Sequence, residues 1–167
     1  MSHKPALHPA LDVLAPLIGT YRGEGSGDFP TIDPFVFGEE VSFLPRGGPV
    51  LAYTQRTWDP GTERPMHGET GFLRPAGEGR IELLLAHTFG LTELQEGHID
   101  RTEVPASGLR LRLESTVIGV AGTAKTVDRV RRELTLTGDL LRSELWMTYD
   151  GIEGEQHLRS ELHRVAS

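Results

Sequence analysis

Residues 109–114 read Leu-Arg-Leu-Arg-Leu-Glu, a strict alternation of apolar and charged side chains. Successive side chains of a β-strand point to opposite faces, so this period of two predicts a strand with one buried face. The alternation returns in residues 133–136 and, after a turn at Gly138-Asp139, in residues 141–147. These segments predict consecutive antiparallel strands near the end of the chain.

The rest of the chain after Gly19 contains further short segments of this kind. The candidate strands cover residues 35–44, 50–58, 69–74, 81–87 and 92–99. Glycine and proline are frequent in the segments that separate them, as expected of turns. The strands recur at roughly 8–14-residue intervals, and no helical segment of about 10–15 residues lies between them. We therefore predict one all-β domain of antiparallel strands over residues 1–167.

The only helical signal lies before Gly19. Leu7, Leu11, Leu14 and Leu17 recur at spacings of three and four, but Pro16 interrupts the pattern. We expect one or two helical turns packed against the sheet. The strand pattern alone leaves a sandwich and a barrel open. In an up-and-down barrel, which has no open edges and can enclose a ligand, this helix would cap one end.

Composition excludes several classes of protein. The formal charge is −7, and the densest basic run, residues 129–132, lies between Asp128 and Glu133, so we interpret it as a solvated strand face rather than a nucleic-acid site. Cysteine is absent, which excludes disulfides, thiolate-ligated metals and thiol nucleophiles. We see no signal peptide and no apolar run of the ~18–20 residues that cross a bilayer. We expect a cytoplasmic protein without nucleic-acid or membrane partners.

The segment 19–32 reads Gly-Thr-Tyr-Arg-Gly-Glu-Gly-Ser-Gly-Asp-Phe-Pro-Thr-Ile, with glycines at alternate positions. Glycine within a strand marks a sharp bend or a place where another group approaches the backbone closely. A ligand near the backbone and a sharply curled barrel strand both remain open. A phosphate-binding loop does not fit, because neither a following helix nor a Lys-Ser/Thr pair is present. No nucleophile elbow for Ser-His-Asp chemistry occurs either.

This segment resembles the signature of the nitrobindin family, GxWxGxGxGxYPTI, with Tyr21 in place of Trp and Phe29 in place of Tyr. Three further blocks follow in the family's order: residues 66–75, residues 82–97, and Met147 with the terminal block 157–164. The resemblance covers about residues 8–165. It implies a ten-stranded up-and-down barrel, similar to fatty-acid-binding proteins and lipocalins, that holds one ferric heme b per chain.

The family's site residues carry over to matching positions of this chain. The resemblance places the proximal iron ligand on His157, and neutral imidazole is a good ligand for iron. It places Met66 and His67 on the distal side, with His67 as a second catalytic residue, and Met147 on the proximal wall. Lys125 is expected near a heme propionate. The remaining expected cofactor contacts lie in the signature itself, at Gly19, Gly23, Gly25, Thr31 and Ile32.

Strand phase complicates the assignment of His157. If Leu158, Ser160 and Leu162 face the interior, His157 points to the other face, so it must lie at an irregular entry to the strand. Among the other histidines, we expect His163 to face solvent and His87 to have a structural hydrogen bond. His67 and Glu69 share a strand face, so a metal pair is conceivable, but two ligands without a third are weak evidence for zinc.

The resemblance implies isomerisation of peroxynitrite to nitrate, with reversible nitric oxide binding. Two alternatives remain: a non-enzymatic carrier of an apolar small molecule, and a heme-based sensor or store of nitric oxide. Fatty-acid carriers of this shape hold a carboxylate with a buried Arg or Tyr, and we assign no buried Arg from the sequence. A homodimer is left open.

Overall fold

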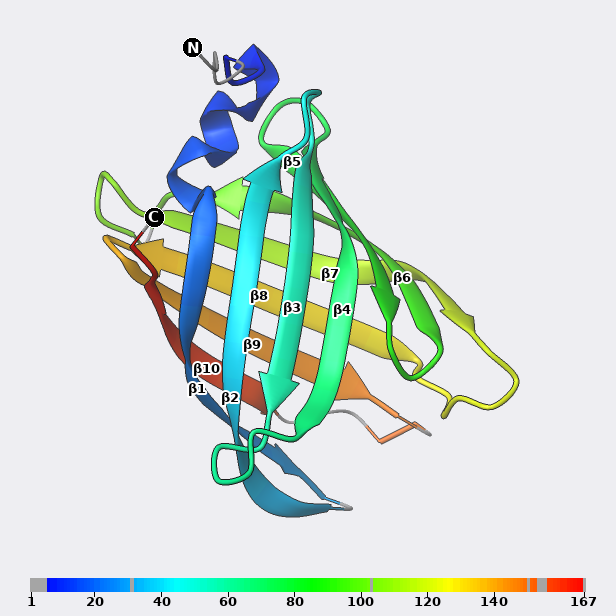
Figure 1. The fold of residues 1–167 in the computed structure, drawn as a ribbon. Coiled ribbons are helices and arrows are strands. Elements are labelled where there is room, and N and C mark those ends of the chain that lie inside the picture. Colours follow the sequence, from blue (N-terminus) through cyan, green and yellow to red (C-terminus); the bar gives the residue numbers. More distant parts are fainter. Residues whose placement is uncertain (1–5, 31, 103, 150, 153–155, 167) are drawn as a thin grey trace.

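Ten antiparallel strands close into a barrel in the computed structural model, which describes residues 6–30, 32–102, 104–149, 151–152 and 156–166 (Figure 1). A 3₁₀-helix, η1 (Pro9–Leu17), precedes them. The strands are β1 (Gly19–Phe29), β2 (Ile32–Pro45), β3 (Leu51–Trp58), β4 (Pro65–Pro75), β5 (Arg80–His87), β6 (Leu91–Asp100), β7 (Leu109–Val120), β8 (Arg129–Thr137), β9 (Leu140–Thr148) and β10 (Gln156–Arg164).

Each strand pairs with the next one along the chain, and β1 pairs with β10 to close the ring. Closure leaves no unpaired sheet edge among these strands, which decides for a barrel over the sandwich that the sequence left open. Every predicted strand is present, most of them longer than the alternating pattern alone indicated. The expected all-β barrel with a short N-terminal helix is confirmed.

Alternation places the core inside the barrel. Leu109, Leu111 and Leu113 are buried, whereas Arg110 and Arg112 between them are only partly covered. The inward leucines of β7 and β8 join a continuous apolar cluster with residues of the other strands and the helix. The burial of one face per strand is what the period of two predicts.

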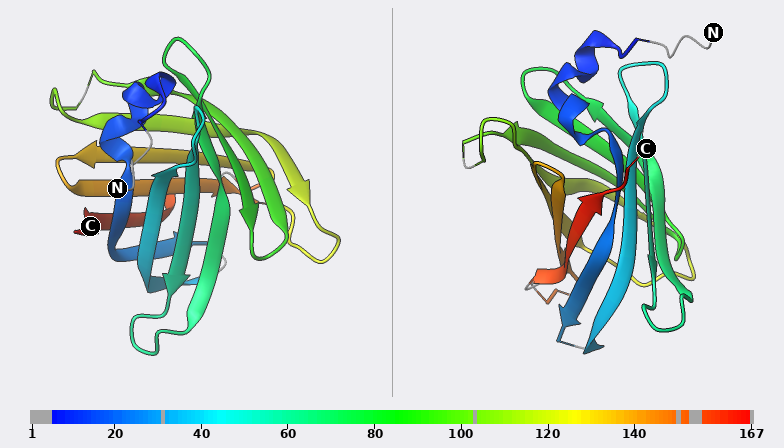
Figure 2. Two further views of the ribbon diagram at one scale, coloured as in Figure 1. Left: turned by 45° about the horizontal axis from the view of Figure 1, so that its top comes forward. Right: turned by 60° about the vertical axis from the view of Figure 1, so that its left-hand side comes forward.

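The helix closes one end of the barrel (Figures 1 and 2). Leu11, Leu14 and Leu17 are buried at a spacing of three, the period at which a 3₁₀-helix superposes its side chains. The Tyr21 hydroxyl donates to the Leu17 carbonyl at 2.9 Å. Arg164, at the end of β10, donates to carbonyls of the last helical turn and stacks over the Tyr21 ring. These contacts attach the helix to both β1 and β10.

An arginine of the run 129–132 lies inside the barrel, contrary to our interpretation of this run as a solvated face. Arg129 and Arg131 are exposed, but Arg132 is only 3% exposed. Arg132 is in phase with the buried residues Val130 and Leu134 of the same strand. The prediction was wrong because the alternation of β8 continues through the basic run, and Arg132 finds an internal partner.

The interior contains two apolar clusters and a set of buried polar side chains. A large apolar cluster, which includes the helix leucines, fills the closed end. A smaller one, built around Leu91, Val127, Val130 and Leu145, lies near the other end. Buried polar side chains, Arg132 among them, lie inside the same barrel.

No helix in the described part of the chain is both long and apolar enough to span a bilayer.

Candidate functional site

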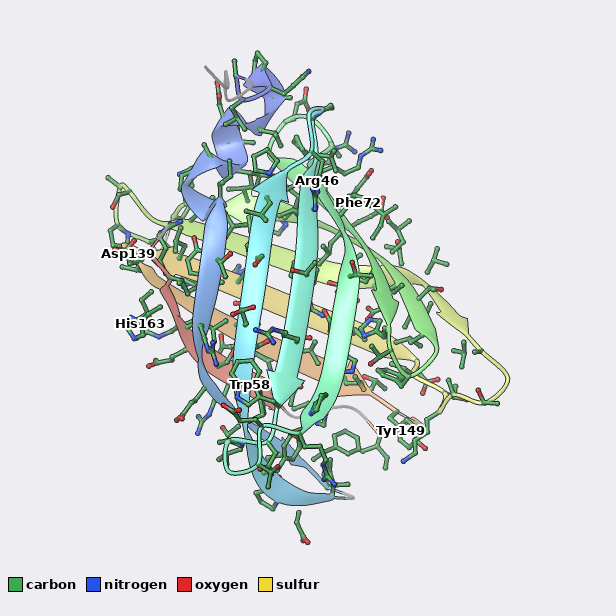
Figure 3. The ribbon with its side chains drawn as sticks, viewed as in Figure 1. Arg46, Trp58, Phe72, Asp139, Tyr149 and His163 are labelled. Atoms are coloured by element: carbon green, nitrogen blue, oxygen red, sulfur yellow. The ribbon has the colours of Figure 1, made fainter. Side chains whose placement is uncertain are left out.

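A cavity of about 220 Å³ lies inside the barrel at the end away from the helix. Trp58, at the end of β3, and Tyr149, just after β9, lie at this end in Figure 3. The lining residues come from β2 to β6 and from β9 and β10, with Phe89 in the turn between β5 and β6: Phe35, Phe37, Gln55, Thr57, Met66, His67, Glu69, His87, Phe89, Glu93, Leu145, Met147, His157 and Leu158.

A β-bulge turns His157 into this cavity. Gln156 pairs with Trp146 and Leu158 pairs with Leu145, so His157 is one extra residue in β10 opposite β9. An extra residue of this kind resets the alternation of a strand and re-aims a side chain. His157 and Leu158 therefore both line the cavity, although they are consecutive. The irregular strand entry that the phase of β10 required is this bulge.

The surroundings of His157 are mainly apolar. The ring of Phe29 lies edge-on to the imidazole at 5.1 Å between centroids. Burial lowers the pKa of His157, and the Asp28 backbone opposes the shift only in part. The side chain is therefore neutral at pH 7, which is the form that coordinates metals. Its Nδ1 atom is buried without a hydrogen-bond partner among the described residues.

Met66 and His67 lie on β4, across the barrel from His157. In the ring of ten strands β4 is four positions from β10 and β5 is five, so both face β10 through the lumen. Met66 is 45% exposed and forms part of the rim. The ring of His67 stacks obliquely on Phe89 at 5.3 Å. The structure thus brings His157, Met147, Met66 and His67 to one cavity.

Polar side chains form the inner floor of the cavity. The Arg132 guanidinium donates to both carboxylate oxygens of Glu69 at 3.0 Å, and to the Tyr53 hydroxyl at 3.0 Å. The Tyr53 hydroxyl in turn donates to Glu69 at 3.0 Å. A buried ion pair is tolerated when further hydrogen bonds satisfy its remaining atoms. Tyr53 supplies two such bonds, whereas Arg132 Nε is buried without a partner among the described residues.

A second group of polar side chains lies beside the first and contains carboxylates, amides and His87. Glu93 Oε1 lies 2.7 Å from His87 Nε2, at ion-pair distance but without the alignment of a hydrogen bond, and Glu93 Oε2 accepts from Gln95 at 2.7 Å. Gln55 donates to Glu39 at 2.9 Å. His87 and Glu93 side chains are almost fully buried. The hydrogen bond that we expected for His87 is present, between its Nδ1 atom and His67 Nε2 at 3.3 Å.

The charges on the floor influence one another strongly. Burial alone would raise the pKa of Glu69, but Arg132 and the nearby histidines outweigh burial and hold it well below its usual range. Burial alone would lower the pKa of Arg132, but Glu69 raises it above its ordinary value. The pair is therefore ionised at neutral pH. Burial raises the pKa of Glu39, which hydrogen bonds from Ser160 and Gln55 offset only in part.

The expected cofactor contacts within the signature are spread along β1 and the turn after it. Gly19 lies near Arg164 at the helix end, and Gly23 faces the backbone of β10. At Gly25 a Cβ would collide with the Phe37 ring, and at Gly27 with the Phe35 ring. Neighbouring aromatic side chains thus occupy the space above these two glycines, and both rings line the cavity.

Two other expected contacts, Ile32 and Lys125, do not line the cavity. Ile32 pairs with Phe29 at the turn from β1 to β2 and is 49% exposed. Lys125 is exposed in the loop that joins β7 to β8. Thr31 lies outside the described residues. The exposed position of Lys125 leaves its ammonium group in solvent, where a propionate would have to reach it from the cavity mouth.

Sequence reasoning missed Arg132, His87 and Glu93 as parts of the site. Arg132 was detectable, because it lies two residues before Leu134 on the alternating face of its strand. His87 and Glu93 flank the turn from β5 to β6, but only the register of β4 with β5 brings His87 opposite Glu69. No local pattern specifies that register.

A heme fits the residues at this end of the barrel. Neutral His157 supplies a nitrogen ligand, its Nδ1 is a buried atom without a partner, and Phe35, Leu145 and Met147 supply apolar walls. The cavity is smaller than the roughly 300–1,000 Å³ of most small-molecule sites, so a group as large as heme would be enclosed only in part.

Comparisons with known proteins agree with this architecture. Peroxynitrite isomerase 2 of Mycobacterium marinum is 42% identical over 160 residues, which cover 95% of this chain and 96% of that protein. Peroxynitrite isomerase of Nocardia farcinica is 43% identical over 159 residues, covering 95% and 93%. The crystal structure of Rv2717c from M. tuberculosis superposes with a TM-score of 0.90 at 41% identity, covering 96% of this chain and all of that one. The model of the THAP4-like, heme-binding β-barrel domain matches residues 10–164, and the chain belongs to that family.

Proposed function

We propose that this chain, as one domain, holds a single ferric heme b through His157 and isomerises peroxynitrite to nitrate. The observation that carries the proposal is the bulge in β10, which directs a neutral, half-buried imidazole into the cavity. Family membership and relatives named peroxynitrite isomerase support the cofactor and the reaction. Peroxynitrite and nitrate contain the same atoms and carry the same charge, so the reaction needs no co-reactant.

The bound ferric heme would supply a Lewis acid for the peroxynitrite oxygen. The protein would hold the heme and enclose the bound substrate. His157 would provide a nitrogen ligand for the iron, and burial, which lowers its pKa, favours the neutral imidazole that binds metal. Phe35, Met147 and Leu158 exclude water from one side of the cavity. His67 lines the opposite wall of the cavity, and we propose that it would donate a hydrogen bond to an anionic ligand.

Reversible nitric oxide binding is part of the same proposal, because heme iron held by His157 as its single protein ligand would be able to bind a diatomic molecule. Met66 and Phe89, both partly exposed, form an apolar rim through which a small uncharged gas can enter. Storage or sensing of nitric oxide would need only this binding, without turnover of peroxynitrite.

The carrier alternative finds a specific obstacle in the structure. A carboxylate carrier needs a buried cation or hydroxyl available to its ligand. Arg132 and Tyr53 are buried, but both already bind the carboxylate of Glu69. A fatty acid would have to displace an internal ion pair to use them. This observation favours the heme proposal.

A hemin titration of the heme-free protein tests the proposal. We expect a saturable Soret band at one heme per chain, lost or strongly shifted in His157→Ala. His163→Ala is the matched control, because His163 lies on the same strand but projects outward from the barrel (Figure 3). Equal, weak spectra for wild type and His157→Ala would remove His157 as the ligand. Stopped-flow decay of peroxynitrite on the heme-loaded protein then distinguishes turnover from storage.

A further inference from the structure

Three donor atoms converge at the inner end of the cavity. His67 Nε2 lies 3.3 Å from His87 Nδ1, and Glu69 Oε1 lies 3.5 Å from each of these nitrogens. The backbone explains the convergence. Glu69 and His87 are direct partners in the pairing of β4 with β5, and His67 is two residues from Glu69 on the same face of β4. The register supplies the third residue that the pair His67 and Glu69 lacks in the sequence.

The separation of these atoms is that of ligands around one small cation. Zinc binds imidazole nitrogen and carboxylate oxygen at about 2.0–2.1 Å in tetrahedral geometry. The edge of such a tetrahedron is about 3.3–3.4 Å, since it equals about 1.6 times the metal–ligand distance. The three observed separations lie at or just above this value. One ion can therefore reach all three atoms without movement of the backbone.

Outer contacts orient two of the three ligands. Glu93 Oε1, 2.7 Å from His87 Nε2, favours the proton on that nitrogen and leaves the Nδ1 lone pair directed at Glu69 and His67. A carboxylate behind a histidine ligand is the usual outer partner in zinc sites. Arg132 and Tyr53 fix the carboxylate of Glu69 in the same way. The positive charge of Arg132 opposes a cation, but Glu93 on the other side of His87 offsets it.

The fourth position of the tetrahedron is open to the cavity. His67, Glu69 and His87 all line it, and the side chain of His67 is 25% exposed toward the mouth. Structural zinc sites are closed by four protein ligands, whereas sites with three ligands keep a position for water or a small molecule. Two histidines and one glutamate belong to the second kind.

We propose that His67, Glu69 and His87 bind one divalent transition-metal ion, Zn²⁺ by preference, with its remaining position facing the barrel cavity. The site uses no atom of His157 and goes beyond the proposed heme function. It shares His67 with the distal side of the proposed heme pocket, so a metal bound to His67 Nε2 would fix the orientation of that side chain. The rival is a cluster of His67, Glu69, His87 and Glu93 that is held together by its own contacts and binds no metal.

Zn²⁺ competition against a chromogenic chelator tests this proposal on the untagged, heme-free full chain after removal of metals. We expect one tightly held Zn²⁺ per chain, and at least about 100-fold weaker binding in His87→Leu and in His67→Ala, beyond the 10–100-fold typical of an outer-shell loss. His98→Ala is the control, because His98 lies on the outer face of β6 and is exposed. His157→Ala, also free of heme, should bind Zn²⁺ like wild type, whatever the hemin titration of this variant shows.

Cobalt supplies a second readout. The Co²⁺-loaded protein should show the intense visible bands of tetrahedral coordination, and these should disappear in His67→Ala. The His67 side chain is 25% exposed, so its removal disturbs the core less than removal of the buried His87. Circular dichroism checks the fold of each variant. The proposal is overturned if wild type binds Zn²⁺ no more tightly than either ligand variant. It is also overturned if His98→Ala loses binding to the same extent, because the metal would then lie elsewhere.

Discussion

The environment of His157 makes this one residue sensitive to pH. Burial lowers its folded-state pKa below the ordinary 6.5, so the folded state disfavours the proton that the unfolded chain accepts. The free energy of unfolding must therefore fall as the pH decreases through 6.5 toward the folded-state pKa. We expect the heme-free wild type to lose more thermal stability than His157→Ala between about pH 8 and about pH 5. If the melting temperatures of wild type and His157→Ala changed equally across this range, the lowered pKa of His157 would be contradicted.

Glu39 is expected to make the stability of the fold depend on pH in the opposite direction, so that its contribution falls as the pH rises. Burial raises its pKa above 4.5, so its ionisation above this pH opposes folding. Glu39→Gln removes the charge and keeps an acceptor for Gln55, which donates to Glu39 in the wild type. We expect the variant to melt at a higher temperature than wild type near pH 7 and at the same temperature below about pH 4. A variant less stable than wild type at neutral pH would show that the carboxylate is needed in its ionised form.

Among the strands, β1 has two glycines, Gly25 and Gly27, that leave space for aromatic rings of the cavity wall. At Gly25 a Cβ would meet both the Phe37 ring and the Arg159 carbonyl. We expect Gly25→Ala to destabilise the barrel by about 1–3 kcal/mol, as for other overpacked sites, and to weaken hemin binding because Phe37 lines the cavity. Urea unfolding and hemin titration measure the two effects.

Gly122→Ala is the matched control. Its Cβ would meet no atom within 4 Å, so we expect a change within about 0.5 kcal/mol and unaltered hemin binding. If both alanine variants behave alike, the alternate glycines of β1 serve the curl of the strand in general rather than the seating of the aromatic rings.

Elements of this barrel differ in how far the sequence predicts them. Strands such as β7 were evident, because one face is apolar and the other charged, and the period of two records this directly. The inward direction of His157 could not be predicted from the sequence. It results from a bulge in the pairing of β10 with β9, and the residues of β10 alone do not indicate that bulge. The same holds for His87, whose partners lie on β4 and β6. Arg132 was misjudged because we weighed its charge above its phase.

The whole molecule is organised around the ion pair of Arg132 and Glu69, which joins β8 to β4 across the lumen between the closed apolar end and the cavity. Both side chains are buried, so removal of one leaves an uncompensated charge. We expect Arg132→Met to lower the free energy of unfolding by about 3–5 kcal/mol in urea. The exposed pair of Arg142 and Glu161 is the control, and Arg142→Met should cost less than about 1 kcal/mol.

The double variant Arg132→Met/Glu69→Leu decides what the pair contributes to the barrel as a whole. When both charges are replaced by apolar side chains of similar volume, the desolvation cost of burying them disappears together with their attraction. We therefore expect the double variant to recover most of the stability lost in Arg132→Met. It should also fail to bind Zn²⁺, because Glu69 is one of the three proposed ligands, and it should still bind hemin through His157. A double variant as unstable as the single one would mean that Tyr53, which bonds to both members of the pair, cannot remain buried without them.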